Sequence, residues 1–135
     1  MRLRLDWLVA AARLLAIASC SGGGEMTSSG SSTASGSVVT IQDFKFTPST
    51  LTVKAGTTVT WTNTGPSAHT TTSDTMVWES SDLVAPMGGD PYGGGAMAGG
   101  TFQFTFNAPG TYSYHCSLHP PSMYPTFTGK IIVTQ

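Results

Sequence analysis

The residues best suited to chemistry lie close together near the C-terminal end of the 135-residue chain. Cys116 offers a thiol, His119 an imidazole three positions later, and Met123 a thioether four positions beyond that. These are soft or borderline donors, which late first-row metal ions accept readily. The segment therefore predicts a metal site built largely from one loop, with one more nitrogen donor supplied from elsewhere.

His69 is the candidate for that nitrogen, and it follows the turn-forming residues 63–68. Two histidines, one cysteine and a weakly bound methionine are the ligand set of blue-copper centres, which transfer single electrons. Four protein donors leave no open position for a substrate, whereas catalytic metal sites retain a water. We expect Asn63 or its neighbours to support the site, because their polar groups can fix the loop around Cys116.

Each donor also has a simpler explanation. His69 alone fits a surface loop, His119 fits a turn, Met123 could fill the core and Cys116 could be an inert buried thiol. His115 is left out, because its side chain points away from that of Cys116 on an extended chain. Four donors within one β pattern favour a copper site, with zinc as an alternative occupant of the two histidines and the cysteine.

Cysteine usage sharpens this interpretation. Cys20 and Cys116 are the only two cysteines, so Cys116 has no intrachain partner once Cys20 is set aside. A lone thiol in an exported protein indicates a metal ligand or a nucleophile. An enzyme with Cys116 as nucleophile and His69 as base is therefore an alternative. No carboxylate pair or Ser/His/Asp set is evident, and we expect the protein not to be an enzyme.

The first residues predict export. Arg2 and Arg4 precede a mostly apolar run, and residues 17–20 resemble a bacterial lipobox, whose cysteine is lipidated. We interpret residues 1–20 as a signal peptide with a lipobox at Cys20; an ordinary secretory signal or a plain membrane anchor is the alternative. The expected location is outside the cytoplasmic membrane, in a bacterial periplasm or at the cell surface, with a lipid anchor.

Two further segments complete the predicted organisation. Residues 21–37 are mainly Gly, Ser and Thr and predict a flexible linker. Residues 38–135 are long enough to close one core. They carry five acidic residues against three lysines, so no basic stripe supports nucleic-acid binding.

Short alternating runs separated by Gly and Pro predict an all-β sandwich or barrel for residues 38–135. The expected strands cover residues 38–41, 44–46, 51–54, 59–63, 102–106, 112–114 and 130–133. Residues 85–100 form a long Gly-rich loop containing Met87 and Met97. We interpret it as a mobile surface insertion, with a second soft-metal site or a partner contact near the metal as alternatives.

Several motifs of residues 38–135 resemble those of a cupredoxin of the plastocyanin and amicyanin type. They are Phe44-Lys45-Phe46-Thr47-Pro48, Leu51-Thr52-Val53-Lys54-Ala55-Gly56, Val59-Thr60-Trp61-Thr62-Asn63 leading to His69-Thr70, Ala108-Pro109-Gly110-Thr111-Tyr112 and Tyr114-His115-Cys116-Ser117-Leu118-His119-Pro120. The resemblance implies a Greek-key β-sandwich or barrel with one type 1 copper, Cu(I)/Cu(II). Its implied ligands are His69, Cys116, His119 and an axial Met123, whose spacing from His119 lies between the plastocyanin and amicyanin patterns.

The resemblance also implies electron transfer through His119 at an apolar surface patch. Leu118, Pro120, Pro121 and Tyr124 could form that patch. The implied partners are redox proteins: a c-type cytochrome, a quinol-oxidising complex, a photosynthetic reaction centre or a terminal oxidase. We expect a monomer. The alternative function is copper binding and delivery without a redox role, in which Met87 and Met97 would assist.

Overall fold

The computed structural model describes residues 37–89 and 91–135. Predictions for the signal peptide, for Cys20 and for the linker up to residue 36 concern residues outside this range. Eight strands and no helix occur among the described residues, which confirms the all-β prediction. No helix there is long and apolar enough to cross a membrane. The strands are β1 (Val38–Gln42), β2 (Lys45–Thr47), β3 (Thr50–Lys54), β4 (Thr57–Asn63), β5 (Thr72–Ser73), β6 (Thr101–Phe106), β7 (Gly110–His115) and β8 (Thr128–Thr134).

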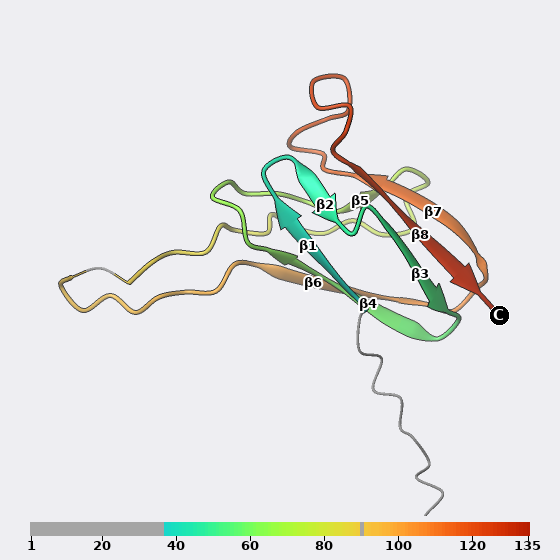
Figure 1. Cartoon of the computed structure of the whole chain (residues 1–135), viewed down its shortest axis with the longest axis horizontal. Helices are drawn as coiled ribbons and strands as arrows, with labels where there is room; N and C mark the ends of the chain where they lie inside the picture. The colour runs from blue at the N-terminus through green and yellow to red at the C-terminus, as the bar shows by residue number, and fades with distance from the viewer. Residues whose placement is uncertain (1–36, 90) are drawn as a thin grey trace, which may run out of the picture. The chain divides into compact units, whose positions relative to one another are not determined.

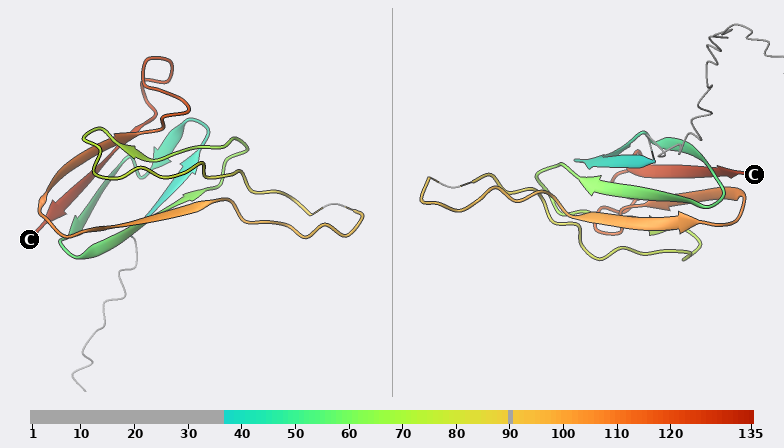
Figure 2. Two further views of the ribbon diagram at one scale, coloured as in Figure 1. Left: turned by 180° about the vertical axis from the view of Figure 1, so that it is seen from behind. Right: turned by 90° about the horizontal axis from the view of Figure 1, so that it is seen from below.

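The strands form two four-stranded sheets (Figure 1). One sheet has the order β2-β1-β4-β6 and the other has the order β3-β8-β7-β5. β1 pairs with β4 in parallel, as β3 does with β8, and the other neighbouring strands are antiparallel. Buried side chains from both sheets form one core, so the sheets pack face to face as a β-sandwich (Figure 2).

Aromatic side chains fill the core beneath the predicted metal site. Trp61 of β4 is fully buried, and its ring centre lies 5.6 Å from those of both Tyr114 of β7 and Trp78. Burying one such ring contributes on the order of 3 kcal/mol. Since Tyr114 is two residues before Cys116, this packing fixes the strand that presents the cysteine.

The parallel pairing of β1 with β4 brings two turns to one end of the sandwich. Ile41 is in register with Asn63 at the ends of these strands, and the Thr64 backbone N–H donates to the Ile41 carbonyl over 2.9 Å. The turn containing Asp43 therefore lies beside the loop that leads to His69. Residues far apart in sequence thus meet at this end.

The short strand β5 was not predicted. Thr72 and Ser73 pair with His115 and Tyr114 of β7, and both are buried despite their hydroxyl groups. A strand of two polar residues carries no period-2 pattern of hydrophobicity, so the sequence gives no signal for it. β5 follows His69 closely and joins the segment carrying this histidine to the strand that precedes Cys116.

Residues 84–89 and 91–100, which we call the arm, extend away from the sandwich as two adjacent segments that precede β6 (Figures 1 and 2). The backbones of Met87 and Met97 exchange two hydrogen bonds of 3.0 and 2.9 Å, and Gly100 donates to the Val84 carbonyl over 2.9 Å. Nearly all described residues of the arm are exposed. The predicted surface insertion is therefore a paired hairpin along part of its length.

Candidate metal centre

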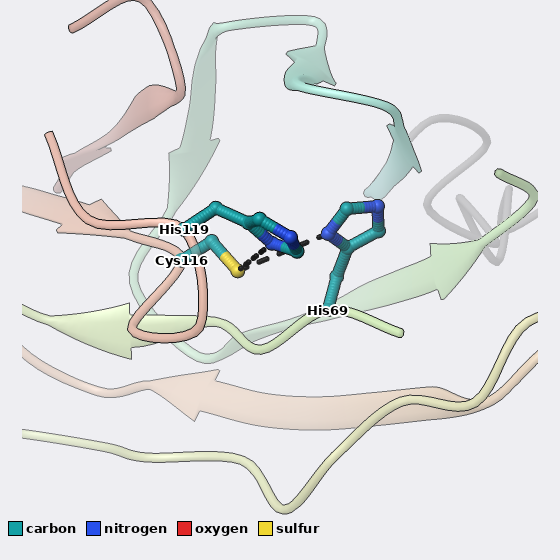
Figure 3. A group of neighbouring side chains, drawn as sticks. All are labelled: His69, Cys116 and His119. Atoms are coloured by element: carbon teal, nitrogen blue, oxygen red, sulfur yellow. Dashed lines mark hydrogen bonds between the residues drawn. The ribbon is translucent and has the colours of Figure 1, made fainter. Parts of the chain in front are cut away.

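Three of the four predicted ligands meet at one end of the sandwich. Donor atoms of His69, Cys116 and His119 all lie within 4.8 Å of one another. Figure 3 shows the sulfur and both rings turned toward a common point. The Cys116 sulfur lies 3.9 Å from Nδ1 of His69 and 3.6 Å from Nδ1 of His119.

These separations suit a single metal ion. Bonds from such an ion to imidazole nitrogen and thiolate sulfur are about 2.0–2.3 Å long. A metal–sulfur bond and a metal–nitrogen bond together exceed both sulfur–nitrogen distances, so one ion can join the sulfur to either ring. His69 and Cys116 are fully buried and His119 is partly buried, and a thiolate with two imidazoles is a donor set that copper accepts in both oxidation states.

Different elements position the three donors. His69 belongs to the loop after β4, and its backbone N–H and carbonyl pair with Leu83 over 3.1 and 2.7 Å. Cys116 directly follows β7, whereas His119 lies farther along the loop between β7 and β8. Two donors thus come from backbone that is paired or directly continues a strand, which limits how far they can move.

The Cys116 sulfur is supported by a residue that the sequence analysis missed. The Thr70 backbone N–H donates to Sγ over 3.3 Å, and the Ser117 backbone N–H donates to Thr70 Oγ1 over 2.8 Å. Hydrogen bonds to the charged form of a group stabilise that form, here the thiolate. Thr70 directly follows His69, so one short segment supplies a nitrogen ligand candidate and a donor to the sulfur.

The far side of the His69 ring meets a second missed residue. Nε2 of His69 donates to Oδ1 of Asp43 over 2.8 Å, which leaves Nδ1 free to face Cys116. Burial lowers the pKa of His69, and the Asp43 carboxylate opposes this shift only in part. Burial also opposes ionisation of Asp43, but its hydrogen bonds with His69 and Ser67 outweigh this and hold its pKa below the ordinary value.

No local pattern could have identified Asp43. It lies 26 positions before His69, in a turn where an acidic residue is common. The two residues meet only because β1 and β4 run parallel and end together. The strand prediction did not include the parallel pairing of β1 with β4, so it could not predict the contact between Asp43 and His69.

Asn63 supports a different loop from the one predicted. Its Nδ2 donates to the carbonyls of Ser67 and Leu83 over 2.7 and 2.8 Å, and its Oδ1 accepts from the Gly65 N–H over 3.0 Å. All three bonds hold the segment that presents His69 rather than the Cys116 loop. The reason is local: Asn63 ends β4, so its amide is nearest to the loop that follows.

Aromatic rings surround His119. Phe44 stacks on Tyr124 at 4.2 Å between ring centres, and both rings pack edge-on to His119 at 5.1 and 5.4 Å. Tyr124 belongs to the predicted apolar patch, in which Leu118 is 45% exposed. His119 is therefore held between the buried donors and a partly apolar surface.

The excluded His115 and the fourth candidate, Met123, both differ from these three donors. His115 bonds Asp74 through Nδ1 over 2.6 Å and is not part of the donor group, which agrees with its exclusion. Met123 lies in the loop of His119, with its backbone N–H bonded to the Pro120 carbonyl over 2.9 Å. Its side chain is 71% exposed, unlike the buried His69 and Cys116, so its role as axial ligand stays a prediction.

Comparisons with known proteins agree with this geometry. Residues 34–134 match the family of copper binding proteins described as plastocyanin/azurin. Amicyanin-alpha of Methylorubrum extorquens is 34% identical over 95 residues, covering 70% of this chain and 69% of the relative.

Two solved structures share the fold. An oxidised methionine-to-leucine variant of amicyanin matches with a TM-score of 0.50 at 32% identity, covering 72% of this chain and 80% of that chain. A purple cupredoxin from Nitrosopumilus maritimus matches with a TM-score of 0.54 at 24% identity, covering 72% and 98%. The family match covers most of the chain, the amicyanin relative is similar over most of its length, and three donors meet where one copper ion would bind. The chain therefore belongs to the plastocyanin/azurin family of copper-binding cupredoxins.

Proposed function

We propose that this protein carries single electrons through one type 1 copper held by His69, Cys116 and His119, with Met123 as the axial ligand. The observation that carries the proposal is the convergence of one sulfur and two Nδ1 atoms, at 3.9 and 3.6 Å. When bound, copper supplies a one-electron couple. A soft donor set with a weak axial thioether suits both of its oxidation states.

The chain's own residues give the site its rigidity. Thr70 donates to the Cys116 sulfur, and Asp43 accepts from the His69 ring. Donors that are already in place need little rearrangement when the charge changes, which favours fast electron transfer. The proposed ligand set leaves no position for a substrate, so we expect no catalytic activity.

His119 is the proposed exit for the electron. It is the least buried of the three donors, and the partly exposed Leu118 lies beside it in sequence. A small apolar patch suits brief docking of a redox partner. We propose a c-type cytochrome, a quinol-oxidising complex, a photosynthetic reaction centre or a terminal oxidase as the class of partner, with the protein acting as a monomer.

The proposed location is outside the cytoplasmic membrane, in a bacterial periplasm or at the cell surface. Support comes from the sequence of residues 1–20, with a lipobox-like end at Cys20, and from the Gly/Ser/Thr-rich residues 21–37. A lipid on Cys20 and a flexible linker would let the copper domain reach partners along a membrane. Mass spectrometry of the exported protein tests this, since an unmodified N-terminus at another residue contradicts it.

An optical spectrum with voltammetry tests the central proposal. Copper-loaded protein should absorb strongly in the red region when oxidised, lose that colour on reduction, and show a reversible one-electron wave. A colourless copper protein without such a wave would reject the electron-transfer function. Zinc-loaded protein serves as the control, because zinc has no redox couple.

Copper delivery is the second candidate, and one observation favours it. Met87 and Met97 form a backbone pair with two mutual hydrogen bonds, which places their side chains on one face of the arm. Both are more than half exposed, and thioethers select Cu(I).

Cu(I) titration of protein whose copper site is already filled tests this second candidate. Delivery predicts that one further Cu(I) binds and shifts the methyl resonances of Met87 and Met97, and that Met87→Leu with Met97→Leu abolishes this second binding step in the titration. Met76→Leu, which changes a methionine of similar exposure elsewhere, is the matched control. Equal weak binding by all three proteins would reject delivery through the arm.

A further inference from the structure

Asp43 contacts a buried imidazole that the proposed function makes a copper ligand. We propose that Asp43 is a positioning residue, which fixes the tautomer of His69 and lowers the reduction potential of the copper. This inference rests on the proposed function and adds a residue outside its ligand set.

The two ring nitrogens of His69 have different partners. Nε2 of His69 lies 2.8 Å from Oδ1 of Asp43, while Nδ1 faces the Cys116 sulfur at 3.9 Å. A carboxylate only accepts hydrogen bonds, so the ring proton belongs on Nε2 and the lone pair on Nδ1. The His69 side chain is fully buried, so this bond also satisfies a donor that water does not reach.

Both carboxylate oxygens of Asp43 accept a hydrogen bond. Ser67 Oγ donates to Oδ2 of Asp43 over 2.8 Å, while Oδ1 accepts from His69. Ser67 belongs to the same loop as His69, and its carbonyl accepts from Asn63. The orientation of Asp43 is thus set by the segment whose histidine it orients.

The absence of a side chain at Gly65 leaves space for the Asp43 carboxylate. A Cβ on Gly65 would lie 2.8 Å from Oδ1 and 2.9 Å from the backbone nitrogen of Asp43. Real Cβ atoms do not approach that closely, so any other residue at 65 would displace the carboxylate. Glycine at this position therefore permits the Asp43–His69 bond.

The charge of Asp43 predicts the direction of its effect. A negative charge near the metal favours the oxidised ion, which carries one more positive charge. A carboxylate bonded to a ligand ring also makes that ring a stronger donor. The Asp43 side chain is 25% exposed, so solvent weakens the effect without removing it. Loss of the charge should weaken Cu(II) binding more than Cu(I) binding.

Asp43→Asn tests this in the copper-loaded full chain, since it keeps an acceptor oxygen and removes the charge. We expect the ratio of Cu(I) to Cu(II) affinity to rise about tenfold, from the usual effect of losing such a partner. For a one-electron couple this raises the reduction potential by about 59 mV. Ser67→Ala should raise it less, because Asp43 then keeps its bond to His69.

Asp74→Asn is the matched control. Asp74 also bonds a histidine, at 2.6 Å, but that histidine is His115, which is not a proposed ligand. The variant therefore removes the same charge beside a ring that is not a proposed ligand, and the reduction potential of the copper should change much less. Equal shifts for Asp43→Asn and Asp74→Asn, or a lower potential for Asp43→Asn, would overturn the proposal.

The tautomer gives a readout that needs no copper. Nitrogen NMR of the apoprotein should show the His69 proton on Nε2, and Asp43→Ala should lose this preference. A wild-type ring with its proton on Nδ1 would also overturn the proposal. A wild-type protein with the Nε2 proton but no reversible redox couple would instead reject the electron-transfer function and keep the positioning role.

Discussion

The metal centre and the arm are both built from segments between strands, yet they are held in opposite ways. In the centre, side chains bond across long stretches of sequence: Asn63 to Leu83, Asp43 to His69, and Thr70 to Cys116. The arm pairs with itself through the backbones of Met87 and Met97, and those side chains are exposed. Polar side chains, rather than backbone pairing alone, therefore fix the position of the donors.

The largest effect should follow from removing the sulfur. Cys116→Ser should abolish the visible absorption of the copper protein and leave the far-ultraviolet circular dichroism unchanged, because a hydroxyl replaces a thiol of similar size. Cys20→Ser, which changes the other cysteine, should keep the colour. If colour survives in Cys116→Ser, the proposed ligand set is wrong.

Asn63→Ala should break the bracing of the His69 loop. It removes the bonds from Asn63 to the Ser67 and Leu83 carbonyls and to the Gly65 N–H, and the Leu83 carbonyl keeps only its bond from the His69 N–H. We expect the free energy of unfolding of the apoprotein to fall by about 3 kcal/mol, measured in urea. Asn107→Ala, at an exposed turn, should cost far less. Similar losses for both variants would show that the bracing is unimportant.

Met123→Leu tests whether the exposed methionine reaches the metal. If Met123 is axial, the variant should retain copper and show a higher reduction potential, because the weak thioether donor is gone. Met76→Leu changes a methionine of nearly equal exposure, 72% against 71%, and should leave the potential unchanged. The same potential in both variants would remove Met123 from the ligand set.

Shortening the arm should have the smallest effect. Replacing residues 88–96 with Asn-Gly would join Met87 to Met97 through a two-residue turn that suits their paired backbones. We expect the free energy of unfolding to change by less than about 1 kcal/mol, since loop closure depends weakly on length. The copper spectrum should not change. Loss of colour would show that the arm supports the centre after all.

The sequence predicted what depends on local pattern. Alternation of apolar residues located seven of the eight described strands to within a few residues, because a half-buried strand imposes a period of two. It missed β5, whose two residues are too few and too polar to show that period. Residue chemistry and family resemblance together identified three donors that the structure brings together.

What escaped prediction depends on register between distant strands. Asp43 reaches His69 because Ile41 is aligned with Asn63 in the parallel pair of β1 and β4. Thr70 reaches the sulfur because the segment after His69 joins β7 through β5. Neither the pairing of β1 with β4 nor that of β5 with β7 can be predicted from composition or residue spacing. Asn63 was identified as a support, but its target was wrong for a local reason: it ends β4, so its amide bonds the loop that presents His69.

The distance along the chain between the donors has a consequence for folding. Cys116 and His119 are neighbours in the unfolded polypeptide, whereas His69 is 47 positions from Cys116. Such a contact forms late, because chain closure over that length and pairing of both sheets must come first. Copper that meets the unfolded chain finds only the donors of one short segment, Cys116, His119 and Met123, and only the folded domain adds His69 to them. The metal should therefore raise the melting temperature by preferring the folded state, and it should enter after folding.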